Sequence, residues 1–441
     1  MLTRRDRMRV FAGTVGFAAA LGLSASAGAE ELAPGTVISA ANIDQVKTQT
    51  FEGHKVGDLI PERLEWQVRN KNLKIRPVEA TNPMPYDPRI NQLTEQYKGQ
   101  ASLDPTTNMI QNYTTGIPFP EINADDPDVA AKIVWNYTTM QPHGDQFWCP
   151  FAQVFIEGSQ GIERIQHWTF ARYYMRARVN QPYVEGDGSQ YHKSLLFARF
   201  PQDIKGLGTF SIRYWDPKLD DIWAYIRTVR RIRRLSGGAW MDPIGGTDQL
   251  QDDLETFNAH PSWYKSYKLL GKTHVFAHAN SAKDVPLTDR GSWYPNASSD
   301  QDTFPRIDLS TEPYWNTRDM WEVRPVYVVE STPPEYHPYS RKINWFDAEI
   351  WRPYFMAGYD QKGEFWKWVS FANRVHESLD GWRDANGNPA IYMFTSFGVN
   401  IDFQRDHATF FTIEGGGACE MNPPGLSPED FNLAVLEETG R

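Results

Sequence analysis

Short runs of alternating hydrophobic and polar residues occupy most of the chain after residue 149. A period of two is typical of β-strands that place one face against a core. Turn sequences rich in Asp, Gly and Asn separate several runs, for example at 360–363 and 384–387. The pattern predicts strands over 151–157, 168–179, 194–200, 208–215, 222–235, 267–277, 322–330, 341–346, 353–359, 364–371, 390–397 and 407–413.

These strands do not alternate with helices, which argues against a parallel α/β sheet. The chain is therefore predicted to be mainly β, with an antiparallel sheet. In the run 364–371, Trp366 and Trp368 share one side, and bulky residues also occupy the other. A strand with bulky residues on both sides is buried on both, so we expect other segments to cover the sheet.

The residues before 149 lack this alternation. Short helices are expected at 43–46 and 56–64, with Pro61 at the start of the second. Residues 81–128 are rich in Pro, Asn, Thr and Asp and predict long, mostly irregular covering structure. The stretch 242–258 predicts a Gly-rich turn followed by an acidic helix. We expect a covering segment over 30–148 and a sheet with insertions over 149–441, together forming one domain.

The first 29 residues have the pattern of a cleaved signal peptide. Four arginines precede an uncharged stretch over 10–23, and Ala27-Gly28-Ala29 fits a small-x-small cleavage site. The apolar stretch is too short to span a bilayer comfortably, since spanning takes roughly 20 apolar residues. We expect a periplasmic protein without a transmembrane segment in its mature chain. Arg4-Arg5 fits the twin-arginine pattern only in part, so the export route stays open.

Charge and composition narrow the functional classes. The formal net charge is −10, and the first 29 residues hold four Arg and one Asp, which leaves −13 on the remainder. Such an acidic chain is a poor match for nucleic acid, whose binding requires neutralised phosphates. Aromatic residues make up 14% of the chain, which suits strands and large amphipathic surfaces. Cys149 and Cys419 can form one disulfide in an oxidising compartment or remain two buried thiols.

One run combines aromatic and cationic residues. Read as a single strand, 222–235 places Trp223, Tyr225, Arg231 and Arg233 on one face. This arrangement suits an amphiphile with an anionic head, held at a cationic mouth. The alternative is a solvated strand end whose arginines pair with nearby acids.

No motif nominates a metal, a cofactor or a catalytic group. His274 and His278 lie four apart in a strand-like context without the Glu of a metal-binding helix. The Asp pairs at 125–126, 220–221 and 252–253 fall in turn-like contexts. The chain has no GxSxG, Walker or dinucleotide fingerprint. We therefore expect a protein that is not an enzyme.

Four segments occur in an order that resembles a known family: 59–66, 200–206, 214–235 and 269–272. Together they resemble the bacterial domain-of-unknown-function family 1329, whose members are similar to the LolA/LolB lipoprotein carriers. The resemblance covers roughly residues 33–413. It implies an incomplete antiparallel β-barrel closed by helices, with an apolar cavity for lipid-like cargo. It also implies an association with outer-membrane proteins or RND-type exporters. This chain is far longer than the small carriers, and its added segments put lipoprotein transport itself in doubt.

The leading hypothesis is a periplasmic carrier or chaperone for a hydrophobic or amphiphilic molecule such as a lipid. The alternatives are a hydrolase or lyase that acts on a periplasmic polysaccharide and an accessory subunit that docks to an exporter or porin. Residue type and position nominate these ligand contacts, the two arginines lying at the rim: Trp215, Trp223, Tyr225, Phe355, Trp366, Arg231 and Arg233. The same aromatic residues can instead fill a packed core.

Overall fold

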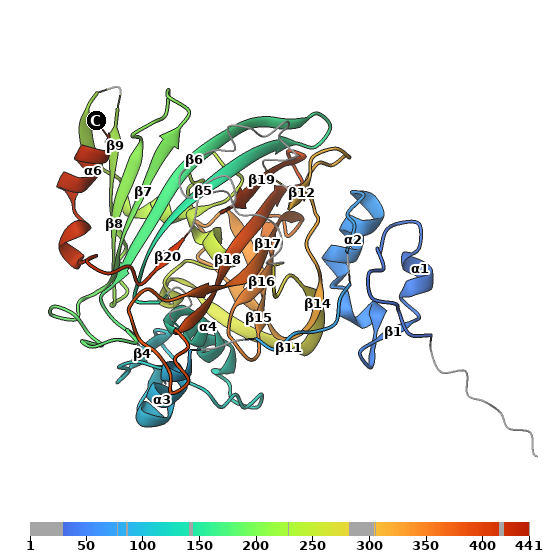
Figure 1. The fold of residues 1–441 in the computed structure, drawn as a ribbon, viewed down its shortest axis with the longest axis horizontal. Coiled ribbons are helices and arrows are strands. Elements are labelled where there is room, and N and C mark those ends of the chain that lie inside the picture. Colours follow the sequence, from blue (N-terminus) through green and yellow to red (C-terminus); the bar gives the residue numbers. More distant parts are fainter. Residues whose placement is uncertain are drawn as a thin grey trace, which may run out of the picture.

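The computed structural model describes residues 30–440 except 77, 85–86, 141–143, 228, 282–303, 305 and 414–418. The expected leader, residues 1–29, lies outside the described residues. A fourteen-stranded sheet dominates the fold (Figure 1). Its strands are β5 (Gln146–Glu157), β6 (Gly161–Tyr174), β7 (Gln190–Phe200), β8 (Gly208–Tyr214), β9 (Asp221–Ile226), β10 (Arg231–Arg234), β11 (Ser266–Ala277), β14 (Glu322–Thr332), β15 (Tyr339–Asp347), β16 (Pro353–Asp360), β17 (Phe365–Glu377), β18 (Ile391–Asp402), β19 (His407–Thr412) and β20 (Glu420–Met421).

The strand order is β10-β9-β8-β7-β6-β5-β19-β18-β17-β16-β15-β14-β11, and β20 pairs with β5. Every pairing is antiparallel. The pair β5–β19 joins two halves, one of strands β5 to β10 and one of strands β11 and β14 to β19, here called the β11–β19 half. The end strands β10 and β11 do not pair with each other, so the sheet is not closed. The prediction of a mainly β, antiparallel, incomplete barrel is confirmed.

Three further strand pairs lie outside this sheet. They are β1 (Thr50–Phe51) with β2 (His54–Lys55), β3 (Ser102–Asp104) with β4 (Met109–Gln111), and β12 (Ile307–Asp308) with β13 (Asn316–Thr317). The helices are α1 (Ile43–Val46), α2 (Glu62–Asn70), α3 (Pro88–Tyr97), α4 (Val129–Thr139) and α6 (Leu433–Gly440), with 3-10 helices η1 (Val56–Leu59), η2 (Gly237–Met241), η3 (Gln251–Thr256), η4 (Pro261–Trp263) and η6 (Pro428–Asp430). Within the described ranges, no helix has both the length and the apolar character needed to cross a bilayer.

The prediction of one strand over 222–235 is wrong, because this run is a hairpin. Strands β9 and β10 pair with each other, and Arg231 lies opposite Ile226. The chain reverses before β10, where Arg230 has a φ of +49°. A tight turn between two runs of similar character leaves the alternation of Ile and Arg nearly unbroken, so the sequence hides the reversal. Trp223 and Arg233 therefore do not lie in one row along a single strand.

A β-bulge places Trp366 and Trp368 on opposite faces of β17, whereas the sequence predicted that they share one face. Gly358 pairs with Lys367 and Tyr359 with Phe365, so Trp366 is the extra residue of β17. As a result Trp368 enters one hydrophobic cluster while Trp366 packs against another. The expectation that both faces of this strand are covered is nevertheless correct.

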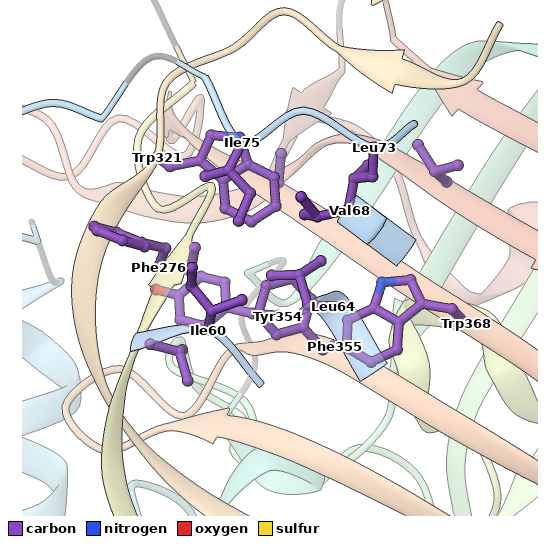
Figure 2. Packing of buried hydrophobic residues seen from close by; sticks show 14 of the residues in the cluster. Ile60, Leu64, Val68, Leu73, Ile75, Phe276, Trp321, Tyr354, Phe355 and Trp368 are labelled. Atoms are coloured by element: carbon purple, nitrogen blue, oxygen red, sulfur yellow. The ribbon is translucent and has the colours of Figure 1, made fainter. Parts of the chain in front are cut away.

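The N-terminal residues cover the outer face of the β11–β19 half. Pro61 precedes α2, whose Leu64 and Val68 are fully buried. These side chains belong to the same cluster as Phe355 and Trp368 of the sheet, and Figure 2 shows them packed together. The 3.6-residue period of α2 thus supplies an apolar stripe for the sheet.

The expectation of mostly irregular structure over 81–128 is wrong in part. Helix α3 forms there, because Pro88 occupies its first turn and the Asp87 carboxylate accepts a hydrogen bond from the Arg89 amide. Helix α4 begins at Val129, directly after this segment, and nearly all of its residues are buried. A helix that is apolar all round has no polar face, and its sequence therefore lacks the amphipathic period. Both helices pack in the cluster that contains Tyr327 and Val329 of β14.

The C-terminal helix α6 lies on the outer side of the other half, over β7, β8 and β9 (Figure 1). Leu436 of α6 and Phe431 before it share a cluster with Leu195 and Phe210. Residues 237–264, here called the inner segment, cover the opposite face of the sheet. This segment contains η2, η3 and η4, and it includes the acidic stretch that was expected to be helical.

Candidate ligand-binding cavity

A cavity lies between the sheet and the inner segment. Its wall comprises residues of β5 to β9, of β17 to β19 and of the inner segment. Because β9 and β17 lie far apart in the strand order, the sheet must curve around this cavity, which makes the inner face concave. The space open to the centre of a water molecule is about 90 Å³, so the cavity is a narrow slot.

Most of the wall is apolar and aromatic. The disulfide-bonded Cys149 lies among these side chains: Phe151, Phe170, Leu196, Ile222, Ile244, Leu254, Phe371, Phe394 and Phe411. A wall of this kind suits a hydrophobic ligand, because such ligands bind by removing apolar surface from water.

Three sets of buried charged groups hold the inner segment against the sheet. Asp248 accepts hydrogen bonds from His407 Nδ1 at 2.6 Å and from the Thr409 hydroxyl at 2.7 Å. The hydrogen bond with the Asp248 carboxylate raises the pKa of His407 above its ordinary value. The middle of the inner segment is therefore attached to β19 by a buried charged hydrogen bond.

The second set involves Lys342 of β15, which is fully buried. Its ammonium lies 3.1 Å from a carboxylate oxygen of Asp252 and 3.1 Å from one of Asp253. Burial alone raises the pKa of Asp252, but Lys342 and His337 outweigh it, so that this pKa is lowered overall. The carboxylate pair that the sequence placed in a turn-like context is thus buried, with the Lys342 ammonium between the two side chains.

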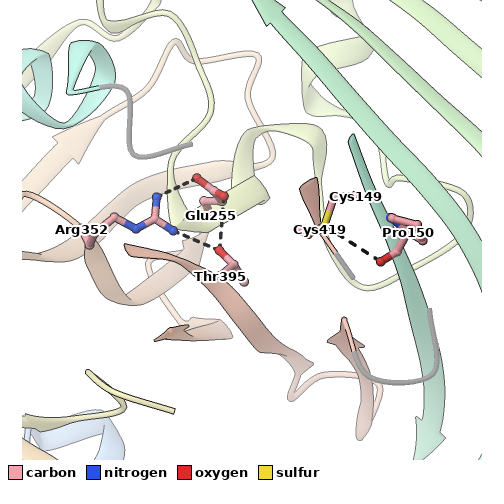
Figure 3. Close-up of a disulfide and its surroundings, with 6 residues drawn as sticks. All are labelled: Cys149, Pro150, Glu255, Arg352, Thr395 and Cys419. Atoms are coloured by element: carbon pink, nitrogen blue, oxygen red, sulfur yellow. Dashed lines mark hydrogen bonds and ion pairs between the residues drawn. A yellow bond between two sulfur atoms is a disulfide. The ribbon is translucent and has the colours of Figure 1, made fainter. Parts of the chain in front are cut away.

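The third set lies at the cavity wall. Arg352 donates a hydrogen bond to Glu255 at 3.2 Å and another to the Thr395 hydroxyl at 3.0 Å, as Figure 3 shows. Glu255 and Thr395 both line the cavity. The structure also joins Cys149 and Cys419 in a disulfide (Figure 3), across 270 positions of the chain. This bond ties β5 to the segment that leads into β20.

One end of the cavity is polar. Arg172, His192 and Arg213 line it together with Glu255 and Asn258, and the same residues line a smaller adjoining cavity. Tyr174 and Tyr191 belong to that second wall, and burial raises the pKa of each. The two cavities thus form an apolar slot that ends among buried polar groups.

The structure does not bring the ligand contacts nominated from the sequence together at this cavity. Trp223 and Tyr225 point to the outer face, where they pack beneath α6. The ring of Trp223 stacks on Phe210 with centroids 5.5 Å apart. Ile222, which precedes Trp223 in β9, has its side chain on the other face and lines the cavity instead. The aromatic part of the run therefore packs in the outer core.

Three other nominated aromatic residues also pack outside the cavity wall. Phe355 is fully buried under the N-terminal residues, beside Trp368 at 5.1 Å (Figure 2). Trp215 follows β8 and stacks on Tyr113 at 5.9 Å. Trp366 is on the inner side, but its indole N–H donates to Asp402 and its ring packs outside the cavity wall. The packed-core alternative describes these residues better.

Arg231 and Arg233 are exposed on β10, at one end of the sheet. Neither lines the cavity. Sequence reasoning missed the residues that do. The run 168–179 carried the available signal, because Phe170 and Arg172 alternate with Ala171 and Tyr173, and strand alternation alone places the first pair on one face.

Within the described part of the chain, no cluster of three or more metal-ligating side chains exists. The ring of His274 packs against that of His54, with centroids 4.1 Å apart, and His278 hydrogen-bonds to Thr317. The two histidines that were considered as a metal pair therefore have separate partners.

The sequence model of the family described as "Protein of unknown function (DUF1329)" matches residues 37–435. No curated protein matches the sequence. Among solved structures, the chain is similar to a putative outer membrane lipoprotein-sorting protein domain from Vibrio parahaemolyticus, with 16% identity, a TM-score of 0.46, and coverage of 71% of this chain and 100% of that one.

Two further solved structures are similar. A DUF1329 family protein from Desulfovibrio piger ATCC 29098 has 15% identity and a TM-score of 0.47, covering 70% of this chain and 99% of that one. A LolA superfamily protein from Nitrosomonas europaea has 12% identity and a TM-score of 0.36, covering 68% and 97%.

Proposed function

The chain belongs to the DUF1329 family, and from its cavity we propose that it carries or chaperones a hydrophobic or amphiphilic molecule in the periplasm. The observation that supports this most directly is the aromatic slot on the concave face of an open sheet. Each CH₂ group that enters such a slot gains about 0.8 kcal/mol by leaving water. A cargo with a chain of several carbons would therefore bind usefully without any covalent chemistry.

The slot must widen to accept such a cargo. About 90 Å³ accommodates roughly six to nine water molecules, since one needs roughly 10–15 Å³ on the same measure, and this is too little for a long acyl chain. The inner segment is the movable wall in this proposal, because it is joined to the sheet mainly through side chains. Leu254 and Ile244 of this segment face the sheet residues across the slot.

Two observations support the periplasm as the compartment. Residues 1–29 have the order of a signal peptide. The disulfide of Cys149 and Cys419 fits an oxidising compartment. In this proposal the carrier serves an outer-membrane protein or an RND-type exporter, and that partner rests on the family resemblance alone.

Native mass spectrometry with lipid extraction, on protein purified from its own periplasm, tests the proposal. Co-purifying apolar mass that dissociates on activation is the expected result. The variant Leu196→Trp should reduce this bound mass because Leu196 lines the slot. Val229→Trp is the matched control, since Val229 is 48% exposed in the β9–β10 turn. A clean apo mass that stays unchanged after incubation with lipids would contradict the carrier.

A further inference from the structure

Seven arginines are buried among the described residues. Six of them have a carboxylate within 4.0 Å: Arg89 with Asp87, Arg178 with Asp145, Arg213 with Asp220, Arg306 with Asp319, Arg324 with Asp347 and Arg352 with Glu255. Arg172 has none in the described part of the chain, although it is only 8% exposed. An unpaired buried charge is costly, so its presence in a folded core requires a reason.

The guanidinium of Arg172 is held by neutral hydroxyl groups. Its Nε donates to the Ser194 hydroxyl at 3.0 Å, and Nη1 donates to the Tyr174 hydroxyl at 3.3 Å. Burial alone lowers the pKa of Arg172, but the Tyr174 hydroxyl raises it, and the result is a pKa above the ordinary value. Arg172 therefore carries a full positive charge inside the protein.

The charges near Arg172 are already neutralised by other partners. Arg213 makes a two-point contact with Asp220, with distances of 2.7 and 3.0 Å. Glu255 attracts Arg172 at longer range, but it is held by Arg352 at 3.2 Å. Counting only the described side chains, the polar end of the cavity is thus left with one positive charge that no adjacent carboxylate neutralises.

This charge lies where the apolar slot meets the polar end. Phe170 and Arg172 both face inward from β6, and the guanidinium carbon lies 5.1 Å from the Phe170 ring centroid. The Tyr174 hydroxyl accepts from Arg172, and among the described residues its own hydrogen has no acceptor. An anion at this place would meet the guanidinium and a hydroxyl donor together.

We propose that the cargo is an amphiphile with a single anionic head, a carboxylate or a phosphate, which binds Arg172 while the tail occupies the slot between Phe170 and Phe411. This inference deepens the proposed function and rests on it. The head displaces no acid partner, because Arg172 has none among the residues that the structure describes. The exposed Arg231 and Arg233 play no part in it.

The test compares two ligands with one tail. Oleate and methyl oleate are titrated into the full mature protein after bound lipid has been removed under native conditions. The wild type should bind oleate at least tenfold more tightly than methyl oleate. Arg172→Gln should abolish this preference and leave the affinity for methyl oleate unchanged, whereas Arg172→Lys should retain part of it. Arg231→Gln is the matched control, and its preference should equal that of the wild type.

Further arms separate the possible failures. Equal affinity of the wild type for both ligands, or a preference that survives in Arg172→Gln, overturns the anionic head but leaves the carrier intact. Binding of neither ligand overturns the proposed function as well. Dodecyl phosphate is titrated in the same way to test a phosphate head in place of a carboxylate, and inorganic phosphate is added as a competitor without a tail. Inorganic phosphate that competes with oleate at equal concentration would show a site for a free anion and overturn the amphiphile. A folding defect in Arg172→Gln leaves the wild-type preference and Arg172→Lys as the test.

Discussion

The Nδ1 of His407 donates a hydrogen bond of 2.6 Å to the carboxylate of Asp248, and both side chains are buried. The bond joins β19 to the inner segment, which forms one wall of the cavity. The other ring nitrogen of His407 lies 3.1 Å from Glu163. A histidine between two carboxylates is stabilised in its protonated form.

Stability should depend on pH through this pair. The pKa of His407 is raised in the folded protein, so its contribution is fully present below the unfolded value and is lost as pH rises through the raised value. We expect the difference in unfolding free energy between wild type and His407→Gln to be larger at pH 6 than at pH 9. Urea unfolding at both pH values measures it. A difference that grows with rising pH would contradict the assignment.

Two buried arginines should respond oppositely to the same substitution. Arg352→Gln removes the cation that lies 3.2 Å from Glu255, whose side chain is 12% exposed, and breaking a buried pair typically costs about 3–5 kcal/mol. Arg172→Gln removes a buried charge that has no acid partner in the described structure, so the unfolding free energy should stay the same or rise. Chemical denaturation of the wild type and both variants, with bound lipid removed, measures these two changes in unfolding free energy. A loss of several kcal/mol in Arg172→Gln would show that its charge is compensated within the protein.

Trp223 should affect stability but not ligand uptake. Its ring is partly buried against Phe210 beneath α6, on the face opposite the cavity. We expect Trp223→Ala to lower the unfolding free energy by about 2 kcal/mol, which is below the 3–5 kcal/mol typical of a fully buried aromatic residue. Denaturation measures the loss, and oleate titration should return the wild-type affinity. A large drop in affinity with normal stability would instead make Trp223 a ligand contact.

The strands could be predicted from the sequence because alternation survives wherever one strand face meets a core. The prediction failed where two different structures share one pattern. Residues 222–235 kept their period of two through a tight turn, so β9 and β10 were read as one strand. In β17 the bulge at Trp366 shifted the period by one residue, which no count of polar and apolar positions detects.

The site was harder to predict because aromatic content does not distinguish an outer core from a cavity wall. Trp223 and Phe355 looked suited to a ligand, yet helices that lie far away in the sequence cover both. Arg172 gave no signal by itself, since an arginine in a strand is ordinarily exposed or paired. Only the positions of the described carboxylates show that none of them pairs with Arg172.

The disulfide should stabilise the fold because it connects β5 with the approach to β20, 270 positions apart. Closing a long loop restricts the unfolded chain, and disulfides typically contribute about 2–4 kcal/mol. We expect the unfolding free energy of the double variant Cys149→Ser, Cys419→Ser to be lower by this amount. The variant should therefore unfold at a lower urea concentration than the wild type. The wild type under reducing conditions should match it, while the double variant should be indifferent to reductant. If reductant destabilises both proteins equally, the two thiols are not bonded to each other and the stabilisation has another source.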